Sequence, residues 1–245
     1  MSETQERYQP GETKEQESET QERCQNPKIF KHLVEHLISL ELQMSGAVEG
    51  EGRAASLKDE GIIKRALKDS QFGDKICDQP ARRFGDMTVL DDDGVMHVVN
   101  IKTSKGGKDN CFSKCGIVYA LTDLAADEIP KQINFKKMYE LIKNHKADIP
   151  QKDYWYLCVN KENTSEIMIR GLKQIRNFVV NINPSNILQI DWKKEKMCEP
   201  VERTWDEAYE TIMGGLKQSI LGYVGNLPDE INREIYEQYS QTYRN

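Results

Sequence analysis

The stretch FGDMTVLDDDGVMHVVNIK, residues 84–102, decides the fold. Residues 84–90 and 95–102 are rich in Val, Met and Ile, a composition typical of β-strands. The residues between them include Asp91-Asp92-Asp93-Gly94, and Asp and Gly tolerate the backbone conformations that a tight turn requires. The stretch therefore predicts a β-hairpin of two antiparallel strands.

Elements of helical periodicity surround this hairpin. Before it, apolar side chains at helical spacing predict a helix from residue 27 and a second over 56–68, with Leu57, Ile62, Ile63, Ala66 and Leu67 facing inward. After it, we expect helices over 113–126, 135–144, 205–223 and 230–243, and strands over 154–159, 166–169, 178–182 and 187–192. This order predicts an α/β domain with a mixed central β-sheet flanked by helices.

The N-terminal segment differs from the rest of the chain. Residues 1–26 carry seven Glu against three basic residues, and ETQERYQ at 3–9 returns as ETQERCQ at 19–25. So polar a segment cannot bury enough apolar surface to offset its ordering entropy. We therefore expect residues 1–26 to form a disordered or loosely helical acidic tail, and 27–245 to form a single domain with C-terminal helices at about 204–243.

Apolar runs and cysteines bear on the cellular location. No run is long enough to span a membrane, residues 1–26 have no apolar core of a secretory signal, and the six cysteines form no C-x-x-C pair. These features predict a cytoplasmic protein with reduced thiols.

Charge is distributed unevenly along the chain. The formal net charge is -6, but residues 130–200 hold thirteen Lys or Arg against eight Asp or Glu. A basic surface on an acidic protein can bind nucleic acid, although solvated helix surfaces explain the same excess.

One group of residues in the hairpin indicates chemistry. Alternate side chains of a strand share a face, so Asn100 and Lys102 project together, while Ile101 points to the opposite face and offers its carbonyl. Across the hairpin, Asp86 can reach the same edge. Oxygen ligands from Asp86, Asn100 and Ile101 suit Mg²⁺, and Lys102 can orient a water molecule. This arrangement is typical of enzymes that hydrolyse phosphodiesters.

These residues resemble the PD-(D/E)XK nuclease superfamily, in particular type II restriction endonucleases of the EcoRV and HincII kind. The resemblance covers about residues 49–192, where IKTSKGG at 101–107 leads into the helix expected at 113–126 and two later strands, 155–159 and 187–192, look like core strands. It implies a restriction-endonuclease-like fold, Asp86 as the principal Mg²⁺ ligand and Lys102 as the residue that positions the nucleophile. It also implies a homodimer that cuts double-stranded DNA at a short specific sequence and leaves 5′-phosphate ends.

Asn100 departs from the family pattern, which has Asp or Glu at that place. A neutral ligand leaves one negative charge fewer for Mg²⁺, and Glu60 on the second expected helix is the best candidate to compensate. Asp91, Asp92 and Asp93 are second choices. If none compensates, the chain is a weak or inactive nuclease-like DNA-binding module; a structure-specific repair or junction nuclease is a further alternative.

DNA contacts are expected from two groups of polar residues. Basic side chains neutralise phosphates, and amide or guanidinium groups read base edges. Near the cleaved phosphate we expect Lys105, Lys108, Asn110 and Ser113, and in the major groove Arg170, Lys173, Gln174, Arg176, Asn177 and Asn181. A polar loop that ends in the turn at Asn183-Pro184 is an equally good interpretation of the second group.

Three histidines have weaker functional signals. Strand alternation turns His97 away from Asn100 and Lys102, so we expect a core histidine. His32 and His36 stand four residues apart on the first helix, a spacing that can bind metal, but without a third ligand we expect a surface pair.

Overall fold

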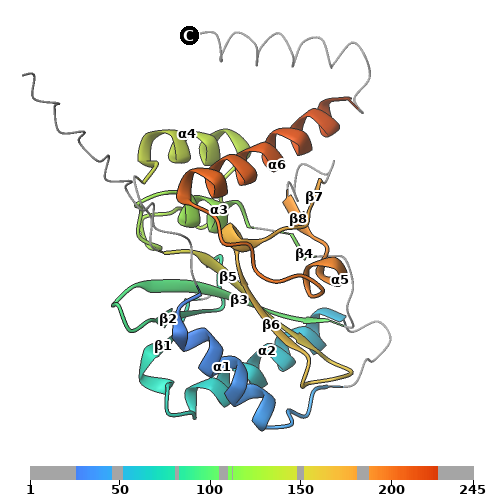
Figure 1. The fold of residues 1–245 in the computed structure, drawn as a ribbon. Helices are drawn as coiled ribbons and strands as arrows, with labels where there is room; N and C mark the ends of the chain where they lie inside the picture. The colour runs from blue at the N-terminus through green and yellow to red at the C-terminus, as the bar shows by residue number, and fades with distance from the viewer. Residues whose placement is uncertain are drawn as a thin grey trace, which may run out of the picture.

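The computed structural model describes residues 26–45, 52–80, 83–104, 110–111, 113–147, 152–180 and 188–225. The expected acidic tail, apart from Asn26, and the expected helix at 230–243 lie outside these ranges. The elements, drawn in Figure 1, are α1 (Lys28–Ser39), α2 (Gly52–Lys68), β1 (Ile76–Asp78), β2 (Met87–Leu90), β3 (Met96–Ser104), β4 (Asn110–Cys111), α3 (Lys114–Leu121), α4 (Phe135–His145), β5 (Tyr154–Asn160), β6 (Ile167–Gly171), β7 (Phe178–Val180), β8 (Leu188–Ile190), α5 (Trp192–Glu195) and α6 (Trp205–Gly225). Short 3-10 helices follow α2 and β6, at Gly73–Lys75 and Leu172–Gln174.

A five-stranded mixed sheet forms the centre of the molecule. Its strand order is β1-β2-β3-β5-β6, so β3 is the middle strand and β1 and β6 are the edges. The pairs β1–β2, β2–β3 and β5–β6 are antiparallel, and β3–β5 is parallel. The prediction of an α/β domain with a mixed sheet flanked by helices is confirmed.

The hairpin predicted from residues 84–102 is formed by β2 and β3. The Asp91 backbone N–H donates to the Val95 carbonyl at 3.0 Å, and the Asp91 side chain accepts the N–H groups of Asp93 and Val95. Gly94 has φ +80°, in the region that glycine adopts most readily. The Asp-rich turn thus closes the hairpin at the predicted place.

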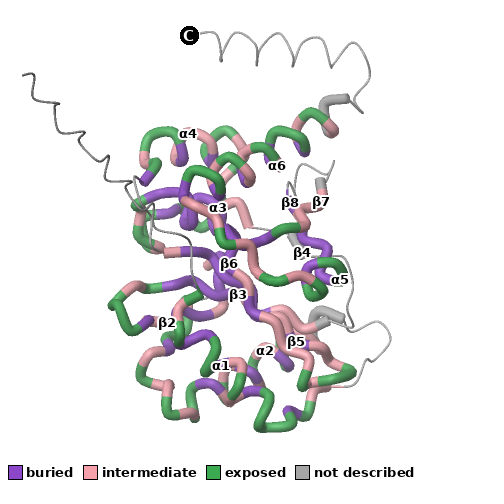
Figure 2. Tube along the Cα trace, in the orientation of Figure 1, coloured by how far each residue is buried: buried purple, intermediate pink, exposed green. Residues whose placement is uncertain are grey.

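Helices cover both faces of the sheet, as the buried segments in Figure 2 show. On one face, α1 and α2 bury Phe30, Leu33 and Ile63 against Val99 and Ile101 of β3 and alternate residues of β5. On the other face, α3, α4 and α6 pack over Val98, Tyr154 and Tyr156 and their neighbours. Successive residues of β3 therefore point into two different cores, as strand geometry requires.

A second, three-stranded sheet has the order β4-β8-β7. The strand expected at 187–192 is formed as β8, which belongs to this small sheet and not to the five-stranded sheet; its residues Leu188 and Ile190 are buried in the core. The strand also ends earlier than predicted, because the Asp191 side chain accepts the backbone N–H of Lys194 and caps α5, which begins at Trp192.

Two details of the helices also differ from prediction. The second helix begins at Gly52, and Leu57 is 62% exposed, because its buried stripe consists of Asp59, Ile63 and Leu67 at four-residue intervals. The helix predicted at 113–126 ends at Leu121, because Thr122 is extended and forms a β-bridge with Lys146.

Among the described residues, none of the helices combines the length and the apolarity that crossing a membrane requires. Cys77, Cys115, Cys158 and Cys198 are free thiols, as predicted for these four residues.

Candidate active site

Asp86 lies directly before β2 and is held against β3. Its backbone N–H donates to the Val99 carbonyl at 2.9 Å, and its carboxylate Oδ2 accepts the backbone N–H of Ile101 at 2.7 Å. The two bonds continue the hairpin pairing beyond the end of β2. They fix the carboxylate beside the segment of β3 that carries Asn100 and Lys102.

Asn100, Ile101 and Lys102 alternate across the sheet. Ile101 is fully buried against α1 and α2, whereas Asn100 and Lys102 are half-buried. The Asn100 Nδ2 atom donates to the Phe84 carbonyl at 3.5 Å. In the described ranges the buried Oδ1 atom of Asn100 has no hydrogen-bond donor. An unpaired buried acceptor costs roughly 1–3 kcal/mol, a cost that a cation or a water molecule at this position would remove.

Glu60 on α2 interacts electrostatically with Asp86 and Lys102. Burial raises the pKa of the Glu60 carboxyl above its ordinary value, and the negative charge of Asp86 raises it further. The positive charge of Lys102 acts in the opposite direction. The helix and the hairpin thus bring Asp86 and Lys102 close enough for their charges to act on Glu60.

Asp59 anchors α2 next to this site, and sequence reasoning missed it. Its fully buried carboxylate lies 2.6 Å from Lys161 Nζ and accepts the backbone N–H and hydroxyl of Ser45 at 2.7 and 2.6 Å. Burial alone would raise the pKa of Asp59, but the hydrogen bonds from Lys161 and Ser45 outweigh it and lower the pKa. The sequence does contain a signal for Asp59: it stands four residues before Ile63, so the two residues lie on the same inner face of the helix.

The other acids considered for the site have partners elsewhere. Asp91 Oδ2 lies 2.9 Å from His97 Nε2, and Asp92 forms an ion pair with Lys75. Asp93 is exposed in the turn. Glu60 is therefore the additional acid that the fold brings to Asp86.

The three histidines have structural contacts. His97 is buried beside α1, where its Nδ1 accepts the Trp155 indole N–H at 3.2 Å; the prediction of a core histidine is confirmed. The His32 ring stacks on Phe72, and His36 Nε2 lies 3.2 Å from the Ala66 carbonyl oxygen.

The oxygen atoms of the site fit Mg²⁺, which prefers hard oxygen ligands and retains several waters. The described part of the chain has no cluster of three His, Cys, Asp or Glu side chains able to hold a metal. An ion at Asp86 would therefore depend on the Asn100 amide oxygen and on main-chain oxygen as well. The unpaired Asn100 Oδ1 is the atom that matches this requirement.

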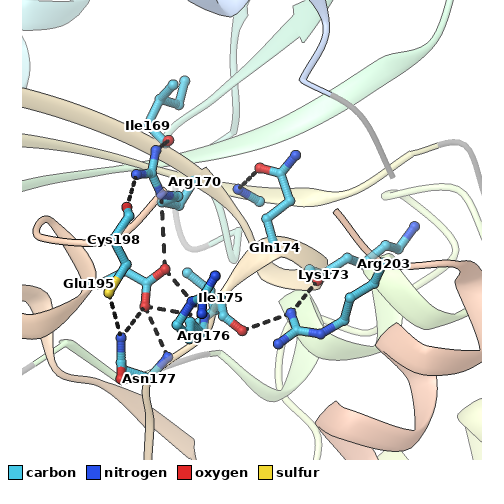
Figure 3. A network of polar contacts seen from close by, with 11 residues as sticks. Ile169, Arg170, Lys173, Gln174, Ile175, Arg176, Asn177, Glu195, Cys198 and Arg203 are labelled. Carbon is cyan, nitrogen blue, oxygen red and sulfur yellow. Dashed lines mark hydrogen bonds and ion pairs between the residues drawn. The ribbon is translucent and has the colours of Figure 1, made fainter. Parts of the chain in front are cut away.

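The stretch predicted to read the major groove forms an internal network instead (Figure 3). Arg170 donates to the carbonyl groups of Ile169 at 3.0 Å and Cys198 at 2.9 Å. The fully buried Glu195 carboxylate accepts the backbone N–H of Arg176 and both the backbone and side-chain N–H of Asn177. These bonds hold α5 next to β6.

Lys173 and Gln174 have the same kind of structural role. Each is 2% exposed; Lys173 Nζ donates to the Lys152 carbonyl at 2.7 Å, and the Gln174 side chain accepts the Gly171 N–H at 3.4 Å. A buried side chain cannot reach a base edge. Of the described residues in this stretch, only Arg176 is exposed.

The remaining residues predicted to bind DNA lie at or beyond the limits of the described ranges. Lys105, Lys108 and Asn181 fall outside them. Asn110 is in β4, where it pairs with Ile190, and the half-buried Ser113 is the N-cap residue of α3. The structure therefore places Ser113 at the start of α3.

No protein-family model matches the chain, and no curated protein is significantly similar to it. A functional proposal therefore depends on the geometry of Glu60, Asp86, Asn100 and Lys102.

Proposed function

We propose that this chain is an Mg²⁺-dependent endodeoxyribonuclease of the PD-(D/E)XK kind. The observation that supports the proposal is the convergence of Glu60, Asp86 and Lys102 next to an unpaired amide oxygen on Asn100. Oxygen ligands for a metal ion beside an ammonium group fit the metal-assisted hydrolysis of a phosphodiester.

Each residue has a distinct role in this proposal. Asp86, the Asn100 amide oxygen and the Ile101 carbonyl hold Mg²⁺, which when bound polarises the phosphate and makes water a better nucleophile at neutral pH. Lys102 orients the attacking water and stabilises the negative charge that develops on the phosphate. Glu60 supplies the second negative charge that Asn100 does not provide.

The strand connections support a restriction-endonuclease-like fold. An antiparallel hairpin, β2–β3, carries the site, and β5 lies parallel to β3 on its other side. The family resemblance of residues 49–192 adds the finer proposal of a type II restriction endonuclease. As proposed, this enzyme is a cytoplasmic homodimer, whose two-fold symmetry would match a palindromic site in double-stranded DNA and produce 5′-phosphate ends.

Digestion of plasmid DNA tests the proposal. The full-length protein is expected to cut supercoiled plasmid in Mg²⁺ and to be inactive in EDTA, while Asp86→Ala and Lys102→Ala lose activity. Asp93→Ala is the matched control, because Asp93 is an exposed carboxylate in the turn of the same hairpin. Discrete fragments would support sequence-specific cleavage. Equal cutting by wild type and Asp86→Ala would refute the assigned site.

The neutral Asn100 favours one alternative, a nuclease-like domain that binds DNA without efficient cleavage. Salt-sensitive DNA binding without any cleavage when Mg²⁺ is added would support that alternative. Cleavage of branched DNA without discrete plasmid fragments would instead indicate a structure-specific repair or junction nuclease.

A further inference from the structure

Two side chains donate hydrogen bonds to the main-chain carbonyl of Phe84. Tyr154 Oη donates to it at 2.6 Å, and Asn100 Nδ2 donates to it at 3.5 Å. Phe84 stands two residues before Asp86, so this carbonyl belongs to the segment that carries the proposed metal ligand. The Tyr154 hydroxyl therefore lies beside the candidate active site, although no step of the proposed reaction uses it.

The position of the Phe84 carbonyl is set by the close approach of residues 84–86 to β3. A Cβ atom on Gly85 would lie 2.2 Å from Val98 Cγ1 and 3.3 Å from the Val99 carbonyl oxygen, so glycine is the residue that fits there. The Asp86 backbone N–H donates to the same Val99 carbonyl at 2.9 Å. These contacts hold the segment on β3, where the Phe84 carbonyl meets the Asn100 side chain.

Packing fixes the Tyr154 ring. Tyr154 begins β5 and is 1% exposed. Its ring centroid lies 5.3 Å from that of Tyr156, in an edge-to-face arrangement, and 6.0 Å from that of Phe84. On α3, a Cβ atom on Gly116 would lie 2.5 Å from a carbon of the ring, so the helix backbone packs directly on it. The hydroxyl is thus held at one place by the rings and the helix around it.

The Tyr154 hydroxyl stays protonated at neutral pH. Burial raises its pKa, and the negative charge of Asp86 raises it further, whereas hydrogen bonding with the side chains of Tyr156 and Asn100 opposes these effects. The O–H group donates to Phe84, and the hydroxyl oxygen retains lone pairs that can accept an N–H of the Asn100 amide. Tyr154 therefore interacts with the amide both directly and through the carbonyl that they share.

These contacts decide which end of the Asn100 amide faces the site. A carbonyl oxygen only accepts hydrogen bonds, so it attracts Nδ2 and repels Oδ1. At 3.5 Å the bond to Phe84 is weak by itself, and the hydroxyl is needed to strengthen the preference. With Nδ2 turned to Phe84, Oδ1 is directed to the other side of the planar amide. Within the described ranges this buried oxygen has no donor, so it is available to a cation.

We propose that Tyr154 is a positioning residue of the metal site, whose hydroxyl acts with the Phe84 carbonyl to hold Asn100 Nδ2 and so directs Oδ1 towards the ion that Asp86 would bind. The inference rests on the proposed function for the ion itself. Tyr154 touches neither the ion nor the substrate. It orients a neutral ligand in the way that outer-shell partners orient ligating His and carboxylate side chains.

Mn²⁺ binding without DNA tests the inference separately from cleavage. The probe is Mn²⁺ alone, added to the full-length protein, with the free ion measured by electron paramagnetic resonance. Tyr154→Phe keeps the ring and removes the hydroxyl. We expect this variant to raise the Kd for Mn²⁺ by about 10-fold, the lower end of the range for outer-shell partners, because the Phe84 carbonyl remains. An unchanged Kd would overturn the inference.

Tyr119→Phe is the matched control. Tyr119 is 2% exposed, and its hydroxyl also donates to a main-chain carbonyl, that of Met96 at the start of β3. The two variants lose the same group from the same kind of contact, so we expect similar decreases in melting temperature. Tyr119→Phe is expected to retain the wild-type Kd for Mn²⁺. Equal increases of Kd in both variants would show a general loosening of the fold and refute the positioning role.

A double-mutant cycle tests whether Tyr154 acts through Asn100. Asn100→Ala removes Oδ1, so adding Tyr154→Phe to this variant is expected to leave the Kd for Mn²⁺ where Asn100→Ala sets it. A further increase of about 10-fold in the double variant would mean that the hydroxyl acts on another part of the site, which contradicts the proposal.

The two proposals fail in different ways. Equal Mn²⁺ affinity of wild type and Tyr154→Phe, in a protein that cuts plasmid, removes the positioning role alone. Mn²⁺ binding that depends on Tyr154 and Asn100, in a protein that cuts no DNA, removes the nuclease assignment and leaves the metal site with its positioning residue.

Discussion

The Asp86 carboxylate accepts the backbone N–H of Ile101 at 2.7 Å, so the side chain directly before β2 is fixed on the main chain of β3. The bond uses Oδ2, and the carboxylate has a second oxygen for an ion. Because Ile101 lies between Asn100 and Lys102, this one contact sets the position of a negative charge relative to both proposed catalytic groups.

Asp86→Asn separates the charge of Asp86 from its structural role. The amide oxygen of the variant can still accept the Ile101 N–H, so we expect a melting temperature close to that of the wild type. Cleavage is expected to fall by at least about 10–100-fold, the loss seen even when outer-shell partners of metal ligands are changed. Thermal unfolding and plasmid cleavage measure the two effects. A variant that melts normally and cuts normally would show that the charge is unnecessary.

Asn100→Asp restores the acidic residue of the family pattern. We expect half-maximal cleavage at a lower Mg²⁺ concentration, because a charged oxygen replaces the neutral Oδ1. The carboxylate also loses the Nδ2 bond to the Phe84 carbonyl, so a small loss of stability is expected. Mg²⁺ titrations of the initial rate test this, with Asn100→Ala as the control that provides no ligand. An unchanged Mg²⁺ dependence in Asn100→Asp would exclude Asn100 from the metal site.

Glu60→Gln is expected to raise stability and to lower activity. The pKa of Glu60 is raised in the folded state by burial and by Asp86, so the folded protein binds its proton more tightly than the unfolded chain does. Ionisation of Glu60 therefore opposes folding, and stability decreases as pH rises above the ordinary pKa of 4.5. The neutral variant should be more stable than wild type at pH 7, and the difference should disappear below about pH 4. Denaturant unfolding across this pH range measures it, and a variant less stable than wild type at pH 7 would contradict the explanation.

His97 is expected to make the fold sensitive to mild acid. Burial lowers the pKa of His97, although its hydrogen bond with Asp91 opposes this effect. The unfolded chain therefore takes up a proton near pH 6.5 that the folded chain resists, and stability is lost as pH falls below that value. His97 contributes at most about 1.4 kcal/mol per pH unit to the slope of the free energy of unfolding against pH. In His97→Gln this part of the slope should vanish, while His32→Gln on the surface of α1 should retain it.

Glu195→Ala is expected to destabilise the fold by about 3–5 kcal/mol, because it leaves buried partners of a charged group unpaired. Those partners are the N–H groups of Arg176 and Asn177. The guanidinium of Arg170 loses its ion pair with Glu195 and keeps its bonds to the carbonyl groups of Ile169 and Cys198. Lys193→Ala, on the exposed side of α5, is the control and should change stability by less than about 0.5 kcal/mol. Urea unfolding distinguishes the two. A loss of DNA binding without a loss of stability would instead restore this stretch as a contact surface.

Local patterns predicted the parts of the fold that depend on neighbouring residues. The Asp-rich turn and the two strands around it identified the β2–β3 hairpin, and alternation correctly separated Ile101 from Asn100 and Lys102. The polar stretch around Lys173 could not be interpreted in this way. Its side chains are buried because they meet Lys152 and Glu195, which are distant in the sequence, and no periodicity reports such partners.

The same limit applies to the candidate site. Sequence spacing identified Asp86 and Lys102, since a hairpin brings them to one edge, and the helix position of Glu60 suggested the third residue. The sequence pattern did not reveal the ion pair between Asp59 and Lys161 that anchors α2 beside the site, because that contact joins a helix to the end of β5.

The middle position of β3 has a consequence for motion. Every residue from Val98 to Ser104 pairs with β5, and the first part of the strand also pairs with β2. Separation of β3 from the sheet therefore requires loss of its pairing with both β2 and β5. Its amide hydrogens should exchange with solvent only through global unfolding. Two of the proposed catalytic side chains, on residues 100 and 102, thus lie on the strand that is the last to unfold.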